Sequence, residues 1–538
     1  MIDARRWSGR MAWSLAIGFL LGGALAPLVV QGDGPPDTAL SYETGPFEPT
    51  WDSLAKGYEC PQWFRDAKFG IWAHWGVQCV PETGDWCARL LYAPEVADSP
   101  WQTTAGKAMY AAHVAKYGHP SQFGLKDLCH EFKADRWDPQ RLVKLYKRAG
   151  ARYFVAMANH HDNFDNWDST YQSWNSVKIG PKKDLIGLWA QAAREENLPF
   201  GVSVHAARAW QWLTPAFGSD RAGPLQGVPY DGHAVKTDGV GKWWEGFDPQ
   251  ELYGAPHAES DPPPQAYIDK FYLRIKELID RYQPALLYFD DRQSPLGAVG
   301  LKIAAHYYNS SLKRRAGVLD VVLNTKGNDE LTCRAVVDDL ERGAKEAISP
   351  APWQTDTCIG NWHYKKGQVY KTPEQVVQML VDVVSKNGNL LLNIPVRGDG
   401  TIDQHEEAIV EQIAQWMSVH GEAIYGTRPW TVFGEGPHAP KGGAMQESPA
   451  NAYTQQDFRY TTKDGVLYAF CMVVPEAELQ LKSLGTTHAL GKRKIASLEL
   501  LGSNEQIPFS QNDDALVVAC PKRFRLGFGC ICFKIRFQ

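Results

Sequence analysis

The strongest constraint on the fold is a repeated alternation of short apolar runs and longer helical segments between about residue 60 and residue 425. The short runs have the length of buried strands, and segments such as 267–282 carry apolar residues at helical spacing. The predicted strands are Phe69–Trp75, Tyr153–Met157, Phe200–Val204, Ala285–Phe289 and Asn389–Ile394, with weaker candidates at Val321–Leu323 and Ala335–Leu340. Strands separated by helices form parallel βαβ units, and about eight such repeats predict a (β/α)8 barrel of the TIM type.

A second domain is indicated after Trp430, where the helical period stops. Apolar or β-branched runs between turn residues, such as 465–474 and 530–537, predict a small antiparallel β-sandwich. We therefore expect a barrel over residues 56–428 and a β-sandwich over residues 429–538. The sandwich has no recognisable chemical motif, and we expect it to pack against the barrel, with glycan binding as the alternative.

The N-terminus resembles an export signal. Arg5, Arg6 and Arg10 precede an apolar run that ends near Val30, which predicts a signal peptide over residues 1–32 and a linker over residues 33–55. Cleavage could follow Ala24-Leu25-Ala26 or fall near Gly32. We expect a secreted or periplasmic protein without stable membrane insertion after cleavage. Because the apolar run is long, an uncleaved N-terminal anchor is the alternative.

Charge and cysteine usage narrow the class of protein further. The net charge is −5 and 22% of residues are charged, so the chain lacks the basic excess typical of nucleic-acid-binding proteins. Export would permit disulfides, and we expect the ten cysteines to comprise buried thiols and a few disulfides of undetermined pairing. The sequence leaves the oligomeric state open.

Polar residues at the ends of the predicted strands are the candidate functional residues, because the C-terminal ends of barrel strands form the catalytic mouth. Asp290 and Asp291 end the fourth strand, although a strand-end Asp can also cap a turn. His160 and His161 follow the second strand and could bind substrate hydroxyls, bind a metal together with Asp162, or lie in a solvated loop. His74, which ends the first strand, could equally be a satisfied structural residue.

The loops after two predicted strands add further carboxylates and an aromatic residue, a combination that would suit chemistry on a sugar. Glu341 and Glu346 follow a probable strand, and either could be the acid/base partner of a nucleophilic Asp. Asp85-Trp86 lies in the loop after the first strand, where the Trp could stack on a sugar face or simply pack.

Taken together, these segments resemble the α-L-fucosidases of glycoside hydrolase family twenty-nine. The resemblance runs from about Trp63 to Trp430 in collinear order. Its matching pieces are Trp63–Gly70, His74-Trp75-Gly76, His160-His161-Asp162 with Phe164, Tyr288-Phe289-Asp290, Val383–Ile394, Asp399–Ile402 and Gly421–Trp430.

The resemblance implies a retaining exo-α-L-fucosidase that acts on a fucosylated oligosaccharide or polysaccharide without a metal or cofactor. It implies that Asp290 is the nucleophile and that His74, His160, His161 and Trp86 contact the sugar. Asp85, at the position of the family's Glu, is expected to be a further substrate contact. The acid/base lies in a variable loop of the family, so Glu341 is inferred from position, with Glu346 as its rival. His205, at the end of the third strand, is a further candidate substrate contact.

Two departures from the family pattern bear on this assignment. Asp85 stands where relatives usually have the longer Glu, and Asp291 stands where they commonly have Gly. These departures make a non-catalytic fucose-binding protein the alternative function. A metal-dependent hydrolase using His160, His161 and Asp162 is a third reading.

Overall fold

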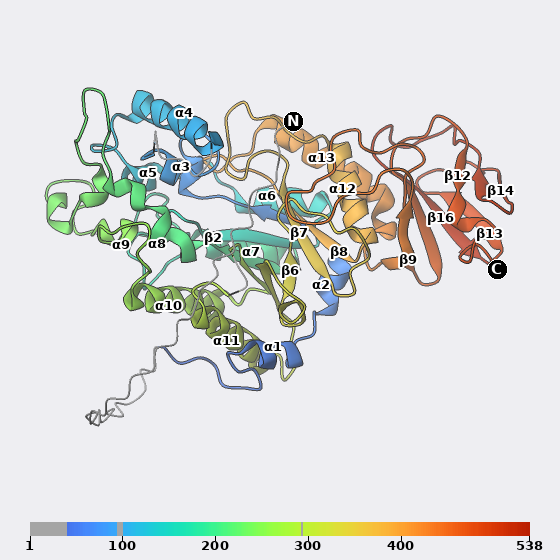
Figure 1. Cartoon of the computed structure of the whole chain (residues 1–538), viewed down its shortest axis with the longest axis horizontal. Coiled ribbons are helices and arrows are strands. Elements are labelled where there is room, and N and C mark those ends of the chain that lie inside the picture. The colour runs from blue at the N-terminus through green and yellow to red at the C-terminus, as the bar shows by residue number, and fades with distance from the viewer. Residues whose placement is uncertain (1–39, 94–99, 292–293) are drawn as a thin grey trace, which may run out of the picture. The chain divides into compact units, whose positions relative to one another are not determined.

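The computed structural model describes residues 40–93, 100–291 and 294–538 (Figure 1). The predicted signal peptide and residues 33–39 of the predicted linker lie outside these ranges. The chain divides into two units, Met1–Ser41 and Tyr42–Gln538, and both the barrel and the C-terminal sheets belong to the second. Within the described ranges, none of the helices has the length and apolar character needed to span a bilayer.

Eight parallel strands close into a barrel in sequence order, as predicted from the alternating pattern. The strands are β1 Phe69–Ala73, β2 Tyr153–Asn159, β3 Phe200–Val204, β4 Leu286–Phe289, β5 Val322–Lys326, β6 Val337–Asp339, β7 Trp353–Cys358 and β8 Gly388–Asn393. The barrel is closed by parallel pairing of β1 with β8, in which Phe69 lies opposite Leu390.

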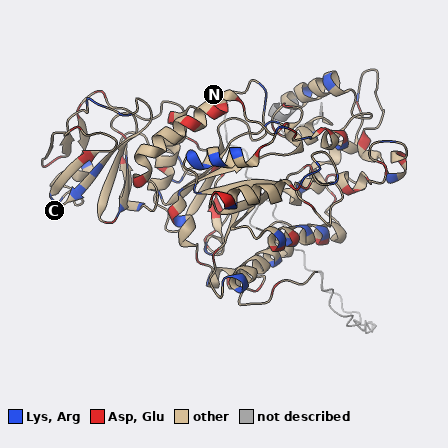
Figure 2. Cartoon of the chain, turned by 180° about the vertical axis from the view of Figure 1, so that it is seen from behind, with Lys and Arg blue, Asp and Glu red and all other residues tan. Residues whose placement is uncertain are grey.

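Four of the main barrel helices begin at a side-chain N-cap, and the other two begin after Pro264 and Gly297 without one. These main helices are α6 Pro139–Arg148, α7 Leu185–Glu195, α10 Gln265–Tyr282, α11 Ala298–Arg314, α12 Pro373–Ser385 and α13 Gln404–His420. In α12, Thr372 and Gln375 form a reciprocal capping box and Pro373 occupies the first turn, where its missing N–H costs nothing. Acidic and basic residues lie on neighbouring helices (Figure 2), as in the ion pair of Arg141 on α6 with Glu407 on α13 at 2.5 Å.

Two long insertions follow β1 and β3. The first contains α3 Cys87–Leu90, α4 Pro100–Tyr117 and α5 Leu125–Glu131, and the second contains α8 Ala209–Trp212 and α9 Gln250–Tyr253. Buried Asp231 joins them by accepting hydrogen bonds from Tyr92 (2.6 Å) and Tyr253 (2.8 Å). The two insertions are therefore held together by buried hydrogen bonds beyond the C-terminal ends of the strands.

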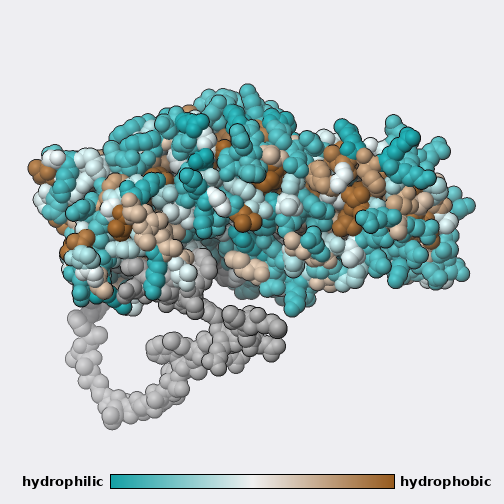
Figure 3. All heavy atoms as spheres, turned by 90° about the horizontal axis from the view of Figure 1, so that it is seen from above, coloured by the Kyte–Doolittle hydropathy of each residue, from teal (hydrophilic) through white to brown (hydrophobic). Residues whose placement is uncertain are grey.

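The C-terminal segment forms the expected sandwich of two antiparallel sheets. One sheet contains β9 Arg428–Glu435, β10 Phe458–Lys463, β11 Val466–Cys471, β13 Ile495–Leu500 and β16 Ile531–Phe537, and the other contains β12 Leu479–Leu481, β14 Phe509–Gln511 and β15 Leu516–Val518. Residues such as Phe458, Phe533 and Leu516 pack both sheets around one apolar core. The face seen in Figure 3 is mainly hydrophilic, with scattered apolar side chains.

The sandwich is joined to the barrel helices by buried polar contacts. Arg459 of β10 donates to Asp382 of α12 at 2.6 Å, and Gln378 of α12 donates to the Met472 carbonyl at 2.8 Å. These contacts agree with the expected packing role.

The expectation of disulfides is wrong. All ten cysteines lie within the described ranges and all are free, seven of them buried. In this chain the cysteines act as small apolar core residues.

Candidate active site

Asp290 directly follows β4 at the C-terminal mouth of the barrel, and its side chain is 11% exposed. His205 Nε2, after β3, donates a hydrogen bond to one carboxylate oxygen, and Lys326 Nζ, at the end of β5, contacts the other. The Tyr288 hydroxyl lies 3.4 Å from Asp290 Oδ1, which is also the oxygen that Lys326 contacts. Side chains from three neighbouring strands therefore converge on one carboxylate.

These partners keep Asp290 ionised. Burial by itself would raise the pKa of the carboxyl, but the electrostatic interactions with His205 and Lys326 and the hydrogen bond from His205 lower that pKa well below its ordinary value. Burial would lower the pKa of Lys326, whereas the surrounding carboxylates, Asp290 foremost, hold it well above its usual range. Asp290 is thus a buried anion with a permanent counter-charge.

Of the two candidate acid/base residues, Glu341 lies close to Asp290 and Glu346 does not. Glu341 lies in the loop after β6, and its Oε2 is 2.9 Å from Lys326 Nζ. Because Lys326 contacts both carboxylates, their nearest oxygens are at most two hydrogen-bond lengths apart, roughly 6 Å. Retaining glycosidases hold their carboxyl groups about 5–5.5 Å apart. Glu346 is exposed and accepts from the Gly442 backbone instead.

The predicted histidines gather beside Asp290. The ring centroids of His74, His160 and His205 lie 4.4–5.1 Å apart, and His161 lies 4.4 Å from His160. Burial, reinforced by the neighbouring imidazoles, lowers the pKa of His74, His160 and His161 well below the usual value. Neutral imidazoles offer one donor and one acceptor each, which suits sugar hydroxyls.

Hydrogen bonds to a side chain and to the backbone fix the orientation of the His160 and His161 rings. Gln78 Nε2 lies 2.7 Å from His160 Nδ1, and His161 Nδ1 donates to the His205 carbonyl at 2.9 Å. The His74 backbone N–H donates to Asn393 at 2.9 Å, while neither of its ring nitrogens has a protein partner among the described residues. The ring of His74 is therefore available to a ligand.

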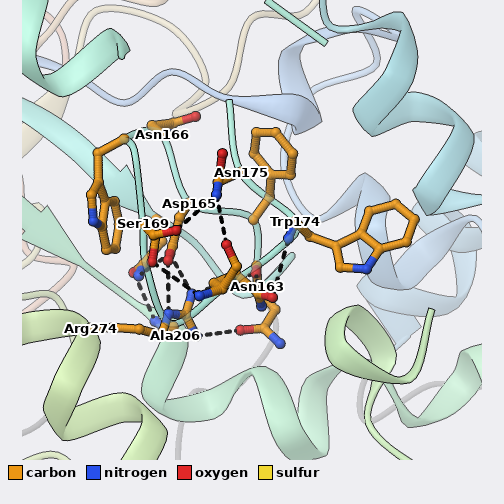
Figure 4. A network of polar contacts seen from close by, with 12 residues as sticks. Asn163, Asp165, Asn166, Ser169, Trp174, Asn175, Ala206 and Arg274 are labelled. Atoms are coloured by element: carbon orange, nitrogen blue, oxygen red, sulfur yellow. Dashed lines mark hydrogen bonds and ion pairs between the residues drawn. The ribbon is translucent and has the colours of Figure 1, made fainter. Parts of the chain in front are cut away.

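A buried polar network holds the loop that carries His160 and His161 (Figure 4). Arg274 of α10 donates to Asp165 at 3.0 Å and to Asn163 at 2.7 Å. Asp165 also accepts from Asn159, the last residue of β2, at 3.0 Å. The Asn159 side-chain oxygen accepts from the His205 backbone at 3.1 Å. The loop after β2 and the start of the loop after β3 are therefore fixed together.

Asp85 and Trp86 lie at the side of the histidine cluster. Asp85 Oδ1 accepts from the backbone N–H of His363 at 2.8 Å. The Trp86 ring packs edge-on against Trp212 at 5.7 Å, and Trp212 lies 4.8 Å from the ring of His161. Trp86 therefore belongs to an aromatic wall that continues to the histidines.

Asp291 is buried and turned toward the loop after β3, where it forms an ion pair with Arg208. Burial raises the pKa of Asp291 to about 6, with Arg208 opposing the rise. The charge that replaces the usual glycine is thus partly compensated within the site.

Several site residues were not anticipated. Lys326 lies just beyond the predicted strand Val321–Leu323, at the end of β5. A polar residue at the end of a barrel strand is a candidate site residue, so this position could have indicated Lys326. Asp339 and Asp356 lie beneath Asp290, each 3.0 Å from the Tyr288 hydroxyl. His363 lies in the loop after β7. The sequence pattern did not predict this strand, so it did not place His363 at a strand end.

Three of the histidines could also hold a metal. Ring nitrogens of His74, His160 and His205 lie within 4.8 Å of one another, the only such group found in the described part of the chain. This trio differs from the set considered from sequence, because Asp162 instead accepts from the Phe164 backbone at 3.1 Å. Imidazole nitrogens can bind zinc as well as sugar hydroxyls, and a chelation experiment separates the two roles.

Comparison with known proteins identifies the family. A family model described as Alpha-L-fucosidase matches residues 37–422. Tissue alpha-L-fucosidase of Rattus norvegicus is 25% identical over 492 residues, covering 88% of this chain and 89% of the rat protein. Plasma alpha-L-fucosidase of Homo sapiens is 28% identical over 398 residues, covering 71% of this chain and 73% of the human protein.

A solved structure agrees over nearly the whole chain. The crystal structure of Thermotoga maritima alpha-fucosidase in complex with fucose matches with a TM-score of 0.63 and 25% identity, covering 91% of this chain and 99% of that chain. The structural match and the family-model match point to the same conclusion. This chain is a glycoside hydrolase that belongs to the alpha-L-fucosidase family.

Proposed function

We propose that this chain is a retaining exo-α-L-fucosidase that hydrolyses terminal α-L-fucosyl bonds of glycans, with Asp290 as nucleophile and Glu341 as acid/base. The observation that carries this proposal is the contact of both carboxylates with Lys326 Nζ at the mouth of the barrel. A retaining mechanism needs two carboxyl groups about 5–5.5 Å apart, and the shared lysine contact allows that separation. The structural relative that was solved with fucose supports the sugar specificity.

In the first step, ionised Asp290 attacks the anomeric carbon of the fucosyl unit. The glycosidic C–O bond breaks as Glu341 transfers its proton to the leaving oxygen, and a fucosyl ester forms on Asp290. The low pKa of Asp290 favours this role, because a nucleophile must be unprotonated and a good leaving group in the next step.

In the second step, Glu341 accepts a proton from water. The water attacks the same anomeric carbon, the ester bond to Asp290 breaks, and fucose leaves with its α configuration retained. Lys326 keeps a carboxylate partner throughout, because Glu341 gains negative charge when Asp290 loses it. His74, His160, His161 and His205 orient the sugar hydroxyls, and Trp86 forms part of the wall beside them.

The alternative of a non-catalytic fucose-binding protein is disfavoured. The family match supports fucosidase activity, and the compensation of Asp291 by Arg208 removes one of the two reasons for considering a lost activity.

Trapping with a fluorinated fucoside tests the proposal. A 2-deoxy-2-fluoro-fucosyl fluoride should inactivate the enzyme with release of fluoride, add the mass of one 2-deoxy-2-fluoro-fucosyl group, and label the peptide that contains Asp290. Labelling of another carboxylate would refute the nucleophile assignment. Absence of both labelling and release of an aryl α-L-fucoside would refute the enzymatic function itself.

We further propose that the protein is exported, with residues 1–32 as its signal peptide. The Arg-flanked apolar run and the plasma location named for the human relative support this proposal. N-terminal sequencing of the mature protein, after expression of the full chain in its own cell type, would find a start near Gly32. A start at Met1 would indicate the uncleaved anchor.

A further inference from the structure

His363 is a fifth histidine of the cluster and lies in the loop after β7. Its side chain is 1% exposed, and its ring centroid is 4.6 Å from that of His74 and 4.8 Å from that of His160. The preceding residue, Trp362, packs at 5.8 Å from the ring of His74. His363 therefore faces the residues that the proposed function assigns to sugar binding.

The position of His363 is set by pairing between two loops. Its backbone N–H donates to Asp85 Oδ1 at 2.8 Å, and nearby Lys366 donates through its backbone to the Glu82 carbonyl at 3.0 Å. Thr83 and Lys365 form an antiparallel bridge between the same loops. The loop after β1 and the loop after β7 thus hold the ring in place before any ligand arrives.

The ring of His363 has an unused hydrogen-bonding edge. Nδ1 lies 3.5 Å from Asp85 Oδ1, so this side of the ring faces a carboxylate and favours the tautomer with hydrogen on Nδ1. Neither Nδ1 nor Nε2 has a hydrogen-bond partner among the described side chains and backbone groups. Leaving a buried polar atom without a partner is costly, which indicates a ligand group at Nε2.

We propose that His363 is a specificity-determining residue of the fucosyl site, with Nε2 accepting a hydrogen bond from one ring hydroxyl. Asp85 is then a positioning residue that acts on the sugar through His363. This assignment accounts for the shorter acid at position 85, because the carboxylate is engaged by His363. The inference rests on the proposed fucosidase function and deepens it.

The test uses aryl α-L-fucoside and its 2-, 3- and 4-deoxy analogues with the same leaving group. In the wild-type enzyme each missing hydroxyl lowers kcat/KM by its own factor. We expect His363→Phe to lower kcat/KM for the parent fucoside by about 10–100-fold, as for loss of a buried hydrogen bond. For one deoxy analogue, the one that lacks the partner hydroxyl, wild type and variant should have equal kcat/KM.

Two further variants keep the test decisive. Asp85→Asn should weaken discrimination at the same hydroxyl, and it provides the answer if His363→Phe does not fold. His420→Gln, a change at a buried histidine of α13 that stacks on Trp416, should leave all four substrates at wild-type rates.

An equal loss on all four substrates in His363→Phe or Asp85→Asn would overturn the inference, because it would indicate a purely structural role. Unchanged kcat/KM in His363→Phe would overturn it as well. A wild-type enzyme that neither turns over the parent fucoside nor is labelled by the fluorinated fucoside would instead refute the proposed function, so the two failures are distinct.

Discussion

His205 Nε2 donates a hydrogen bond to the carboxylate of Asp290, joining the ends of two neighbouring barrel strands. The two residues are 85 positions apart in the chain. Asn159 fixes the backbone of His205, and Arg274 fixes Asn159 through Asp165. The charge state of the proposed nucleophile therefore depends on a histidine whose position is set from the helix layer.

This relationship predicts a change in pH dependence. His205 lowers the pKa of Asp290, so His205→Asn should raise that pKa. Because Asp290 must be ionised to attack, the acid-side fall of kcat/KM should begin at higher pH than in wild type. The loss of kcat/KM relative to wild type should therefore be larger at pH 5 than at pH 7.

A matched control is His306→Gln, which alters another buried histidine that contacts an aspartate, Asp280, at 2.9 Å. Its pH profile should follow wild type. An unchanged acid limb in His205→Asn would show that His205 does not govern the ionisation of Asp290.

The acid/base assignment predicts a dependence on leaving group. Glu341→Gln should lower kcat/KM about 10²–10⁴-fold for a natural disaccharide, whose leaving oxygen needs a proton. It should have a much smaller effect on formation of the fucosyl ester from a dinitrophenyl fucoside, which leaves without one. Steady-state and burst kinetics on both substrates would measure this difference.

Glu346→Gln provides the comparison, since it is the same substitution in the same loop at an exposed site. It should behave as wild type on both substrates. The reverse result, with Glu346→Gln inactive and Glu341→Gln active, would exchange the two assignments.

Chelation should leave activity intact. If His74, His160 and His205 bind sugar hydroxyls rather than a metal, prolonged dialysis against EDTA and phenanthroline will not change kcat/KM. Activity on an aryl α-L-fucoside before and after dialysis, together with elemental analysis, measures this. A loss that zinc restores would establish the metal-dependent reading instead.

The contact between barrel and sandwich should contribute strongly to stability. Asp382 is the shared partner of buried Lys386 (2.8 Å) and Arg459 (2.6 Å). Asp382→Ala would leave two buried cations unpaired and should lower the free energy of unfolding by about 3–5 kcal/mol at pH 7. Chemical denaturation followed by tryptophan fluorescence would measure the change.

The pH dependence of this effect has a definite sign. Burial would raise the pKa of Asp382, but Arg459 and Lys386 lower it below the ordinary value. Its stabilisation is therefore present at neutral pH and is lost as pH falls through that lowered pKa. Glu407→Ala, which breaks an exposed pair with Arg141, should cost less than about 1 kcal/mol. Equal effects of the two variants would contradict this prediction.

Periodicity predicted most of the barrel because the signal is local, but it missed two elements. Strand β7, Trp353–Cys358, is fully buried although it contains Gln354, Thr355 and Asp356, so it lacks the apolar pattern of a strand. In helix α11, polar residues such as Asn309 interrupt the apolar sequence pattern, and Asn309 Oδ1 accepts a hydrogen bond from the Phe47 backbone at 3.1 Å. In both cases, buried polar groups are satisfied by partners that are distant in sequence.

The sequence by itself determined the barrel, the sandwich and the positions of Asp290 and the first four histidines, because alternation of apolar residues and the ends of strands can be read locally. Only the tertiary structure decided that Lys326 links Asp290 to Glu341, that Arg208 compensates Asp291, and that His363 joins the histidine cluster. These relationships arise because closure of the barrel brings the ends of different strands to one mouth. No local pattern encodes which side chains then come within hydrogen-bonding distance.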